Sequence, residues 1–245
     1  MSKIKLSIIT LSYDNLNFTK KFVSSIRKNT KTAYELIIVD NGSNQDVQSW
    51  VVKNSDKNIL FKKNQGFAKG FNAGIEKSEG EFIMMCNNDT EFPKNWDLKL
   101  LQNFEKYDNV GMVSPTYTSG SRLIALRSQT KDRQIISKKL GDYPSGVAYL
   151  VNKEFLINKI KCWCEEYPIA SGEDADFCYR VWSKNRDIII DERVLILHEG
   201  KVTTKSKIKN WKKLWKKNAK LFRKKWFFYY FFSPLARIYI KMKYD

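Results

Sequence analysis

Apolar and polar positions alternate with two distinct periods along the first 114 residues. Short runs of β-branched and other apolar residues predict strands at 6–13, 34–40, 58–63, 81–86 and 110–114. Between several of these runs the apolar residues recur at helical spacing, as at Leu16, Phe22, Val23 and Ile26. Strands that alternate with helices predict an α/β protein, in which a mainly parallel, twisted sheet carries helices on both faces.

The pattern changes after residue 115. Residues 116–144 are mostly polar and show little periodicity, so we expect a functional lid or binding loop there. Regular spacing then resumes and predicts a strand at 147–151, a helix at 153–160, a helix from 172 to 184, and two strands at 187–190 and 194–197.

Composition indicates a folded chain with an uneven charge. The hydrophobic content of 42% and aromatic content of 14% exclude a disordered protein, and 245 residues suffice for one domain with an appendage. The net charge is +18, but 15 of the 44 basic and one of the 26 acidic residues lie in 201–245. The first 200 residues therefore carry 29 basic against 25 acidic side chains and are close to neutral.

The basic tail has an amphipathic pattern over 208–232. Apolar pairs recur every seven residues at 214–215, 221–222 and 228–229, and lysines and arginines fill the intervals. This predicts a basic helix with an aromatic face, which either lies on an anionic membrane surface or packs against the domain or a second subunit. Nucleic-acid binding is a third interpretation, but it leaves the near-neutral first 200 residues unexplained.

The cysteines and the start of the chain favour a cytoplasmic protein. Of the four cysteines, one ends a predicted strand and one lies in a predicted helix, and the opening MSKIKL lacks an apolar signal stretch. No apolar run approaches the ~20 residues that cross a bilayer. We therefore expect a cytoplasmic protein that binds peripherally at the inner face of the membrane.

Polar side chains follow three of the predicted strands. Ser12 and Tyr13 end the first strand, Asp40 ends the second, and Asn87, Asn88 and Asp89 follow the fourth. Ligands of open parallel sheets bind beyond the carboxyl ends of the strands, so these residues predict a shared site. The chain has no G-x-G-x-x-G after the first strand and no G-x-x-x-x-G-K-[ST], so a bound diphosphate would need a metal.

Candidate metal ligands and a candidate base can be read from the same strand ends. Asp89 offers a hard carboxylate ligand, and His198, the single histidine, follows a predicted strand. Glu173 and Asp174 begin a predicted helix, where they either cap it or supply a general base. Taken singly, the pattern favours an ordinary turn at Asp89 and a structural role for His198, so neither residue alone indicates a metal site. The glycines at 66, 70 and 74 favour close helix packing over a phosphate cradle.

The ordered motifs resemble a known family. Across residues 4–203 the chain is similar to the family 2 glycosyltransferases of the GT-A fold, particularly the rhamnosyltransferase-like bacterial members. The resemblance rests on SIITLSYDN, LIIVDNGS, NQGFAKGFNAGI, CNNDTEFPKNW, SGVAYLVNKEFL, GEDADFCYRVW and LHEGKVT. It implies a catalytic domain at 1–203 and a basic helical extension at 204–245.

The resemblance also implies a role for each candidate residue. Asp40 would bind the nucleotide base, in a pocket completed by Thr10, Ser12 and Tyr13. Asp89 would be the last residue of the family's D-x-D motif and would coordinate Mn²⁺ or Mg²⁺ together with His198; an imidazole ligand favours Mn²⁺. This chain departs from the motif because Asn87, which adds no charge, holds its first position; Asn87 and Asn88 would bind the nucleotide or donor. Asp174 would be the catalytic base with Glu173 beside it, and four further residues would bind the donor or border the acceptor: Lys69, Asn72, Ser145 and Gly146.

The implied activity is an inverting, metal-dependent sugar transfer. The donor would be a UDP- or dTDP-sugar, since the Asp40 carboxylate can accept from the N3–H of uracil or thymine. The acceptor would be a hydroxyl of a saccharide or lipid-linked saccharide in bacterial surface glycan synthesis. A sugar nucleotidyltransferase is disfavoured because LSYDNLN lacks the glycines and basic residues of a phosphate loop. We expect no nucleic-acid partner, and oligomer formation stays open.

Overall fold

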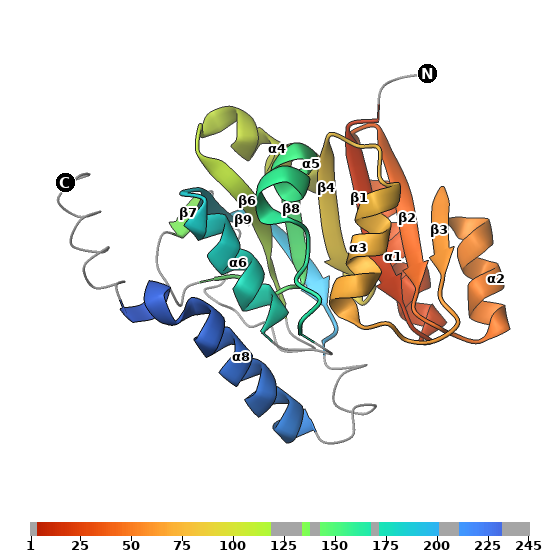
Figure 1. The fold of residues 1–245 in the computed structure, drawn as a ribbon. Coiled ribbons are helices and arrows are strands. Elements are labelled where there is room, and N and C mark those ends of the chain that lie inside the picture. Colours follow the sequence, from red (N-terminus) through yellow and green to blue (C-terminus); the bar gives the residue numbers. More distant parts are fainter. Residues whose placement is uncertain (1–3, 119–133, 138–142, 168–171, 201–210, 232–245) are drawn as a thin grey trace.

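A computed structural model describes residues 4–118, 134–137, 143–167, 172–200 and 211–231 (Figure 1). Its first half is a parallel sheet in the order β3-β2-β1-β4. The strands are β1 (Leu6–Ser12), β2 (Tyr34–Asp40), β3 (Lys57–Leu60) and β4 (Phe82–Asn87). The helices between them are α1 (Leu16–Asn29), α2 (Gln45–Asn54) and α3 (Phe67–Lys77). This half is the parallel, helix-connected arrangement that the sequence predicts.

The second half of the sheet is mixed. Its strands are β5 (Thr90–Glu91), β6 (Val110–Tyr117), β7 (Gln134–Ser137), β8 (Ala148–Asn152) and β9 (Asp187–His198). Its helices are α4 (Trp96–Lys106), α5 (Lys153–Phe155), the π-helix η1 (Leu156–Ile160) and α6 (Glu173–Ser183). β8 lies antiparallel between β4 and β6, whereas β6 and β9 pair in parallel. The antiparallel β8 joins the two parallel groups into one sheet.

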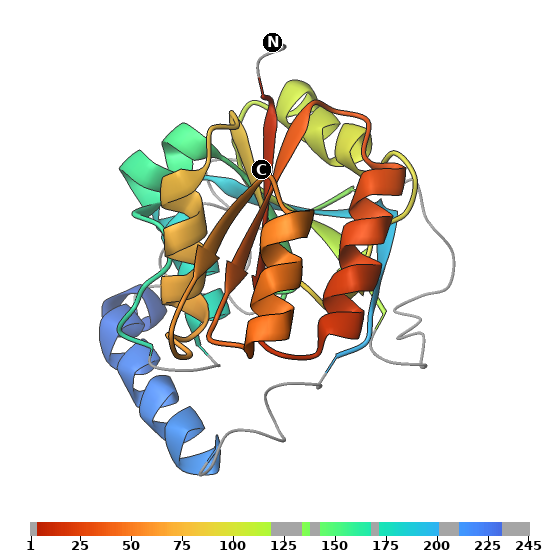
Figure 2. The same cartoon turned by 90° about the vertical axis from the view of Figure 1, so that its right-hand side faces the viewer.

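Two apolar cores lie on the two faces of the sheet. Alternate residues of the strands reach opposite faces, as Ile8 and Ile9 of β1 do. One face is covered by α1, α2 and α4, through buried side chains such as Phe22, Val51 and Trp96. The other face is covered by α3, η1 and α6, through Phe71, Ile160 and Phe177 among others. Figure 2 shows α3 on one side of the first strands and α1 on the other. The prediction of helices on both faces is confirmed.

The two strands predicted at 187–190 and 194–197 are one continuous strand, β9. The charged residues between them suggested a turn, but Asp191 is fully buried within the strand and is compensated there. Arg193 pairs with its carboxylate at 2.7 Å, and Asn103 of α4 donates to it at 2.8 Å. The register against β6 shifts between Pro115 and Thr116, so the polar segment bulges without ending the strand.

β3 and β6 each end three residues from their predicted limit, and the segment 116–144 contains a strand. β3 ends at Leu60: the Phe61 N–H makes the last ladder bond, to the carbonyl of Asp40, and the chain bends at 62–63. β6 continues to Tyr117 because Thr116 and Tyr117 pair with β9. β7 pairs antiparallel with β9 where the polar pattern predicted only loop. The rest of the predicted loop, 119–133 and 138–142, lies outside the described residues.

The tail contains α8 (Trp211–Phe231), which packs against α6 (Figure 1). The rings of Phe222 and Trp226 contact Tyr179 of α6 edge-on, with centroids 4.9 and 5.3 Å away. Of the alternatives for this aromatic face, packing against the domain therefore describes Phe222 and Trp226. Residues 232–245 lie outside the described range.

In the part of the chain that the structure describes, no helix is both long enough and apolar enough to cross a bilayer. The four cysteines are free: Cys86, Cys162, Cys164 and Cys178.

The glycines of α3 serve close packing, as the sequence predicts. A Cβ at Gly70 would lie 2.9 Å from Leu11 Cδ2, and one at Gly74 would overlap the Ile9 side chain. α3 therefore lies closer to β1 than a helix with side chains at these positions could.

We expect Gly74→Ala to lower the free energy of unfolding by about 1–3 kcal/mol, because the added methyl group overpacks the α3–β1 contact. Chemical denaturation of the variant measures this loss. Glu76→Ala, an exposed change in the same helix, should stay within about 0.5 kcal/mol of the native chain. Equal stability of Gly74→Ala and the native chain would show that the contact is loose.

Candidate functional site

The sheet brings the predicted strand ends side by side. In the order β2-β1-β4, Ser12 pairs with Asp40 in register, and Leu11 pairs with Asn87. The polar residues that follow these three strands therefore share one edge of the sheet. This is the location that the sequence predicts for a ligand site.

Asp40 is fully buried, and its carboxylate orders the loop after β2. Oδ1 accepts from the backbone N–H groups of Gly42 and Ser43 at 3.2 and 2.8 Å, and from Gln48 Nε2 at 3.1 Å. Oδ2 accepts from the Ser43 hydroxyl at 2.6 Å. The sequence pattern did not single out Ser43 or Gln48, because their role depends on how the loop folds back on Asp40.

Thr10 and Ser12 carry hydroxyl groups toward the same face of β1 as Asp40 on β2. Both side chains are fully buried, and neither hydroxyl has a hydrogen-bond partner among the described residues. An unpaired buried hydroxyl is costly, so these oxygens are well suited to a polar ligand. Tyr13 follows them and is half-buried.

A tight turn after β4 presents Asp89. The Thr90 hydroxyl donates to the carbonyl of Asn87 at 2.6 Å. The amide of Asn88 donates to Thr19 of α1 at 2.8 Å, which anchors the turn to that helix. The Thr90 hydroxyl thus closes the turn, and the Asn88 side chain points to α1.

Asp89 and His198 are 109 residues apart in the chain and meet in the structure. β5 pairs antiparallel with the end of β9, so that Thr90 lies opposite His198, and the Glu199 N–H donates to the Asp89 carbonyl at 3.1 Å. This pairing places Asp89 Oδ1 3.3 Å from His198 Nε2. Each side chain is 14% exposed.

The pair opens into a pocket of about 220 Å³, lined by Phe18, Lys21, Asp89, Thr90, Glu91, Thr118, Leu197, His198 and Glu199. The donor set, one carboxylate oxygen and one imidazole nitrogen, fits a divalent cation that keeps positions open for phosphate and water. The other ring nitrogen, Nδ1, is buried with no hydrogen-bond partner among the described residues. No cluster of three or more His, Cys, Asp or Glu side chains forms a metal site within the described ranges.

Glu173 and Asp174 occupy the first turn of α6. Gly172 precedes them with φ +95°, a left-handed conformation that favours glycine. Glu173 is buried at 8% exposure, whereas Asp174 is partly exposed and accepts the Ala175 N–H at 2.8 Å. The partly exposed Asp174 is therefore the better placed of the two to reach a ligand.

Asp174 borders Gly146, which follows Ser145 in the chain. A Cβ at Gly146 would lie 3.2 Å from Asp174 Cβ, and the rings of Phe67 and Trp163 lie just beyond. Burial raises the pKa of the Asp174 carboxyl above its ordinary value, and the backbone N–H groups of Ala175 and Gly146 oppose that rise. A carboxylate with a raised pKa accepts a proton more readily than an ordinary one.

Tyr117 connects the two parts of the site and was not predicted. Its ring meets His198 edge-on with centroids 5.6 Å apart, and its hydroxyl lies 2.6 Å from Ser145 Oγ. The sequence pattern ended this strand at 114, which left Tyr117 in the polar loop. A continuous line of contacts thus runs from Asp89 through His198, Tyr117 and Ser145 to the segment beside Asp174.

The two candidates on α3 have different surroundings. Lys69 is exposed. Asn72 is tied to the segment after η1: its amide donates to the Trp163 carbonyl at 3.0 Å and to Glu165 at 2.8 Å, and its oxygen accepts the Trp163 N–H at 2.8 Å. Asn72 therefore fixes the position of Trp163.

Comparison with known sequences places the chain in a family. The profile of Glycosyl transferase family 2 matches residues 7–161. An uncharacterised glycosyltransferase of Rickettsia bellii is 30% identical over 191 residues, which cover 74% of this chain and 27% of that protein. One of Haemophilus influenzae is 27% identical over 189 residues, covering 72% of this chain and 61% of that protein. The chain thus spans less than two thirds of either relative.

Solved structures with the same fold include two complexes with nucleotides. GalNAc-T7 with UDP, GalNAc and Mn²⁺ superposes with a TM-score of 0.70 at 14% identity, over 89% of this chain and 48% of that one. S. aureus TarS 1-349 with UDP-GlcNAc gives 0.68 at 18% identity, over 84% of this chain and 62% of that one. With the profile match over more than half of the sequence, these findings show that the chain belongs to glycosyl transferase family 2 and has the GT-A fold.

Proposed function

We propose that this protein transfers a sugar from a UDP- or dTDP-sugar to a hydroxyl of a saccharide or lipid-linked saccharide acceptor, with inversion at the anomeric carbon. The observation that carries the proposal is the placement of Asp174 beside Gly146, whose neighbour Ser145 contacts Tyr117 and, through its ring, His198 of the Asp89–His198 pair. A base and a candidate diphosphate site then border one crevice. Synthesis of a bacterial surface glycan is the process that we expect to use this product.

The nucleoside would bind at the ends of β1 and β2. Thr10 and Ser12 offer unpaired buried hydroxyls, and Tyr13 and Asp40 complete the pocket. Four donors already occupy the Asp40 carboxylate, so it recognises the N3–H of uracil or thymine only when the loop of Ser43 shifts. Lys69 and Asn72 lie on α3, and Asn87 is the last residue of β4. These three side chains would line the donor site without adding a negative charge to it.

Asp89 and His198 would hold a divalent cation, with Mn²⁺ favoured over Mg²⁺ by the imidazole nitrogen. When bound, the cation supplies positive charge that stabilises the diphosphate as a leaving group. Asp89 Oδ1 and His198 Nε2 lie 3.3 Å apart, which is close enough for both atoms to bind one cation. The complex of GalNAc-T7 with UDP and Mn²⁺ supports this assignment.

Asp174 would act as the general base. Its carboxylate takes the proton of the acceptor hydroxyl while the hydroxyl oxygen forms a bond to the anomeric carbon. The bond from that carbon to the diphosphate breaks on the opposite side, and its electron pair stays on the phosphate oxygen. One displacement of this kind inverts the anomeric configuration. The buried Glu173 supports the turn and takes no proton in this scheme.

We expect Asp174→Asn to lower the rate of nucleoside diphosphate release by about 10²–10⁴-fold, because the amide cannot accept the proton. The assay follows release from UDP- and dTDP-sugars with Mn²⁺, and NMR of the product reports its anomeric configuration. Because burial raises the pKa of Asp174, the native rate should fall on the acid side at a pH higher than for an ordinary aspartate. Glu173→Gln is the matched control and should keep both the rate and the pH profile.

A product that keeps the donor's configuration would contradict the inverting mechanism. Loss of activity in Glu173→Gln and not in Asp174→Asn would move the role of base to Glu173.

We expect Asp89→Ala and His198→Ala each to weaken Mn²⁺-dependent UDP binding by about tenfold or more, since each removes one of two protein ligands. Titration calorimetry of UDP with and without Mn²⁺ measures this without turnover. Glu91→Gln changes another carboxylate of the same pocket and should leave the affinity unchanged. An equal loss in all three variants would mean that the charge of the pocket, and not this pair, holds the cation.

The outer face of α8 is the surface that we propose to contact an anionic membrane. Because α6 occupies the Phe222 and Trp226 side of the helix, the opposite side faces outward. That side is exposed and basic, with Phe227 55% exposed among the cations Lys213, Lys216, Lys217, Lys220, Arg223 and Lys224. Such a face suits phosphate headgroups, and a lipid-linked acceptor would then lie near the site.

Replacement of Lys213, Lys216 and Lys220 by Gln should weaken binding to vesicles with anionic lipid by about 100-fold, at ~1 kcal/mol for each charge. Co-sedimentation with phosphatidylglycerol vesicles measures the change, and added salt should weaken native binding. Gln at the exposed Lys53, Lys77 and Lys184 lowers the net charge equally and should have little effect. Equal losses in the two triple variants would contradict a specific role for α8.

A further inference from the structure

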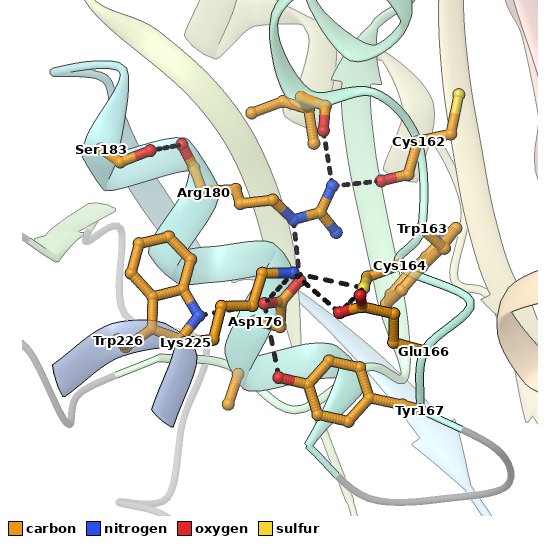
Figure 3. Close-up of polar contacts among 12 residues, drawn as sticks. Cys162, Trp163, Cys164, Glu166, Tyr167, Asp176, Arg180, Ser183, Lys225 and Trp226 are labelled. Carbon is orange, nitrogen blue, oxygen red and sulfur yellow. Dashed lines mark hydrogen bonds and ion pairs between the residues drawn. The ribbon is translucent and has the colours of Figure 1, made fainter. Parts of the chain in front are cut away.

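A fully buried carboxylate connects α6 to α8 (Figure 3). Asp176 lies in the first turn of α6 with no exposed surface. Its Oδ1 accepts from Trp226 Nε1 at 3.0 Å and lies 3.0 Å from Lys225 Nζ, both on α8. Arg180 lies one turn further along α6, a spacing common in exposed ion pairs, but the burial of Asp176 excludes a surface pair here.

The same carboxylate also contacts Arg180 of α6 and Tyr167 of the segment after η1. Its Oδ2 accepts from Arg180 Nε at 2.8 Å, and the Tyr167 hydroxyl lies 3.4 Å from Oδ1. The guanidinium of Arg180 also donates to the carbonyls of Ile160 and Cys162 at the end of η1. We call Asp176 and its four partners Tyr167, Arg180, Lys225 and Trp226 the Asp176 cluster.

α8 contacts α6 at two further places. Tyr179, one turn along the helix, meets Phe222 and Trp226 edge-on. At the start of α6, a Cβ at Gly172 would lie 3.7 Å from Asn218 Cβ and 3.1 Å from the Tyr167 ring. α8 and the 160–167 segment therefore hold the glycine that begins α6 as well as the turn that follows it.

Asp174 and Asp176 share this first turn but point in different directions. Two residues along an α-helix turn the side chain by about 200°, so they lie on nearly opposite sides. Asp174 faces Gly146, whereas Asp176 faces α8. Fixing the Asp176 side of the turn consequently fixes the direction of the Asp174 side.

We propose that Trp226 and Lys225 of α8 are positioning residues for the reaction, acting through Asp176 on the candidate base Asp174. This inference rests on the proposed function and extends it, because it makes the basic tail helix part of the catalytic machinery. A buried carboxylate without its donors is costly, so loss of either donor loosens the turn. A misplaced base lowers turnover far more than it lowers donor binding, since the donor contacts other elements.

The test is Trp226→Phe, which removes the indole N–H and keeps a ring against Tyr179. We expect kcat to fall by about tenfold or more, with the KM for the donor and the affinity for UDP within about twofold of native. Lys225→Met, which removes the charge and keeps an apolar stem, should give the same split. Trp215→Phe is the matched control, because Trp215 lies on α8 at 53% exposure, and it should leave kcat unchanged.

A readout independent of activity separates this proposal from the proposed function. Hydrogen exchange by mass spectrometry on peptides covering 172–183 should be faster in Trp226→Phe than in the native chain and Trp215→Phe. Unchanged exchange, or equal kcat losses in Trp226→Phe and Trp215→Phe, would overturn the positioning role. A native chain that releases no nucleoside diphosphate would refute the proposed function, and the exchange data would still decide whether the Asp176 cluster holds the turn.

Discussion

The pairing of β5 with the end of β9 is the interaction on which the candidate site depends. β5 has only two residues, yet it joins the turn after β4 to the last residue of a strand that begins about 100 positions later. Strand pairing holds the backbones of β5 and β9 at hydrogen-bonding distance. The carboxylate of Asp89 and the imidazole of His198, from distant segments, therefore approach to 3.3 Å. Without that pairing, Asp89 in the turn after β4 and His198 at the end of β9 would not share a pocket.

Buried charges impose a second constraint, which shapes the frame around the site. Asp40, Asp97, Asp176 and Asp191 are all fully buried, and a buried carboxylate is tolerated only where donors surround it. Asp97 accepts from the backbones of Lys31 and Thr32, and so holds the start of α4 to the loop before β2. Asp97, Asp176 and Asp191 join segments that are distant in sequence and so fix the relative position of helices and strands, whereas Asp40 orders its own loop. Asp174 is the contrast, because it is partly exposed and keeps capacity for a ligand.

The contacts of α8 change the interpretation of the basic tail helix. By composition it is a basic helix with an aromatic face, a pattern typical of membrane-surface helices. In the structure that aromatic face meets α6, so the helix carries two different surfaces: an inner one that contacts the turn of the candidate base and an outer one that is basic. Membrane contact and positioning of the base would then involve opposite sides of one helix, so that each can be altered without the other.

The sequence alone determined the α/β class, the first four strands and the residues at their ends, because these follow from local periodicity and from the rule that parallel strands share a carboxyl edge. It also supplied Asp89, His198 and Asp174 through the order of the motifs. It failed where a distant partner overrides the local pattern. Arg193 and Asn103 keep the charged segment at Asp191 in a strand, β9 extends β6 to Tyr117, and α6 takes the face of α8. Only the tertiary structure decides such features, because the energy that stabilises them comes from contacts between residues far apart in the chain, which no local spacing records.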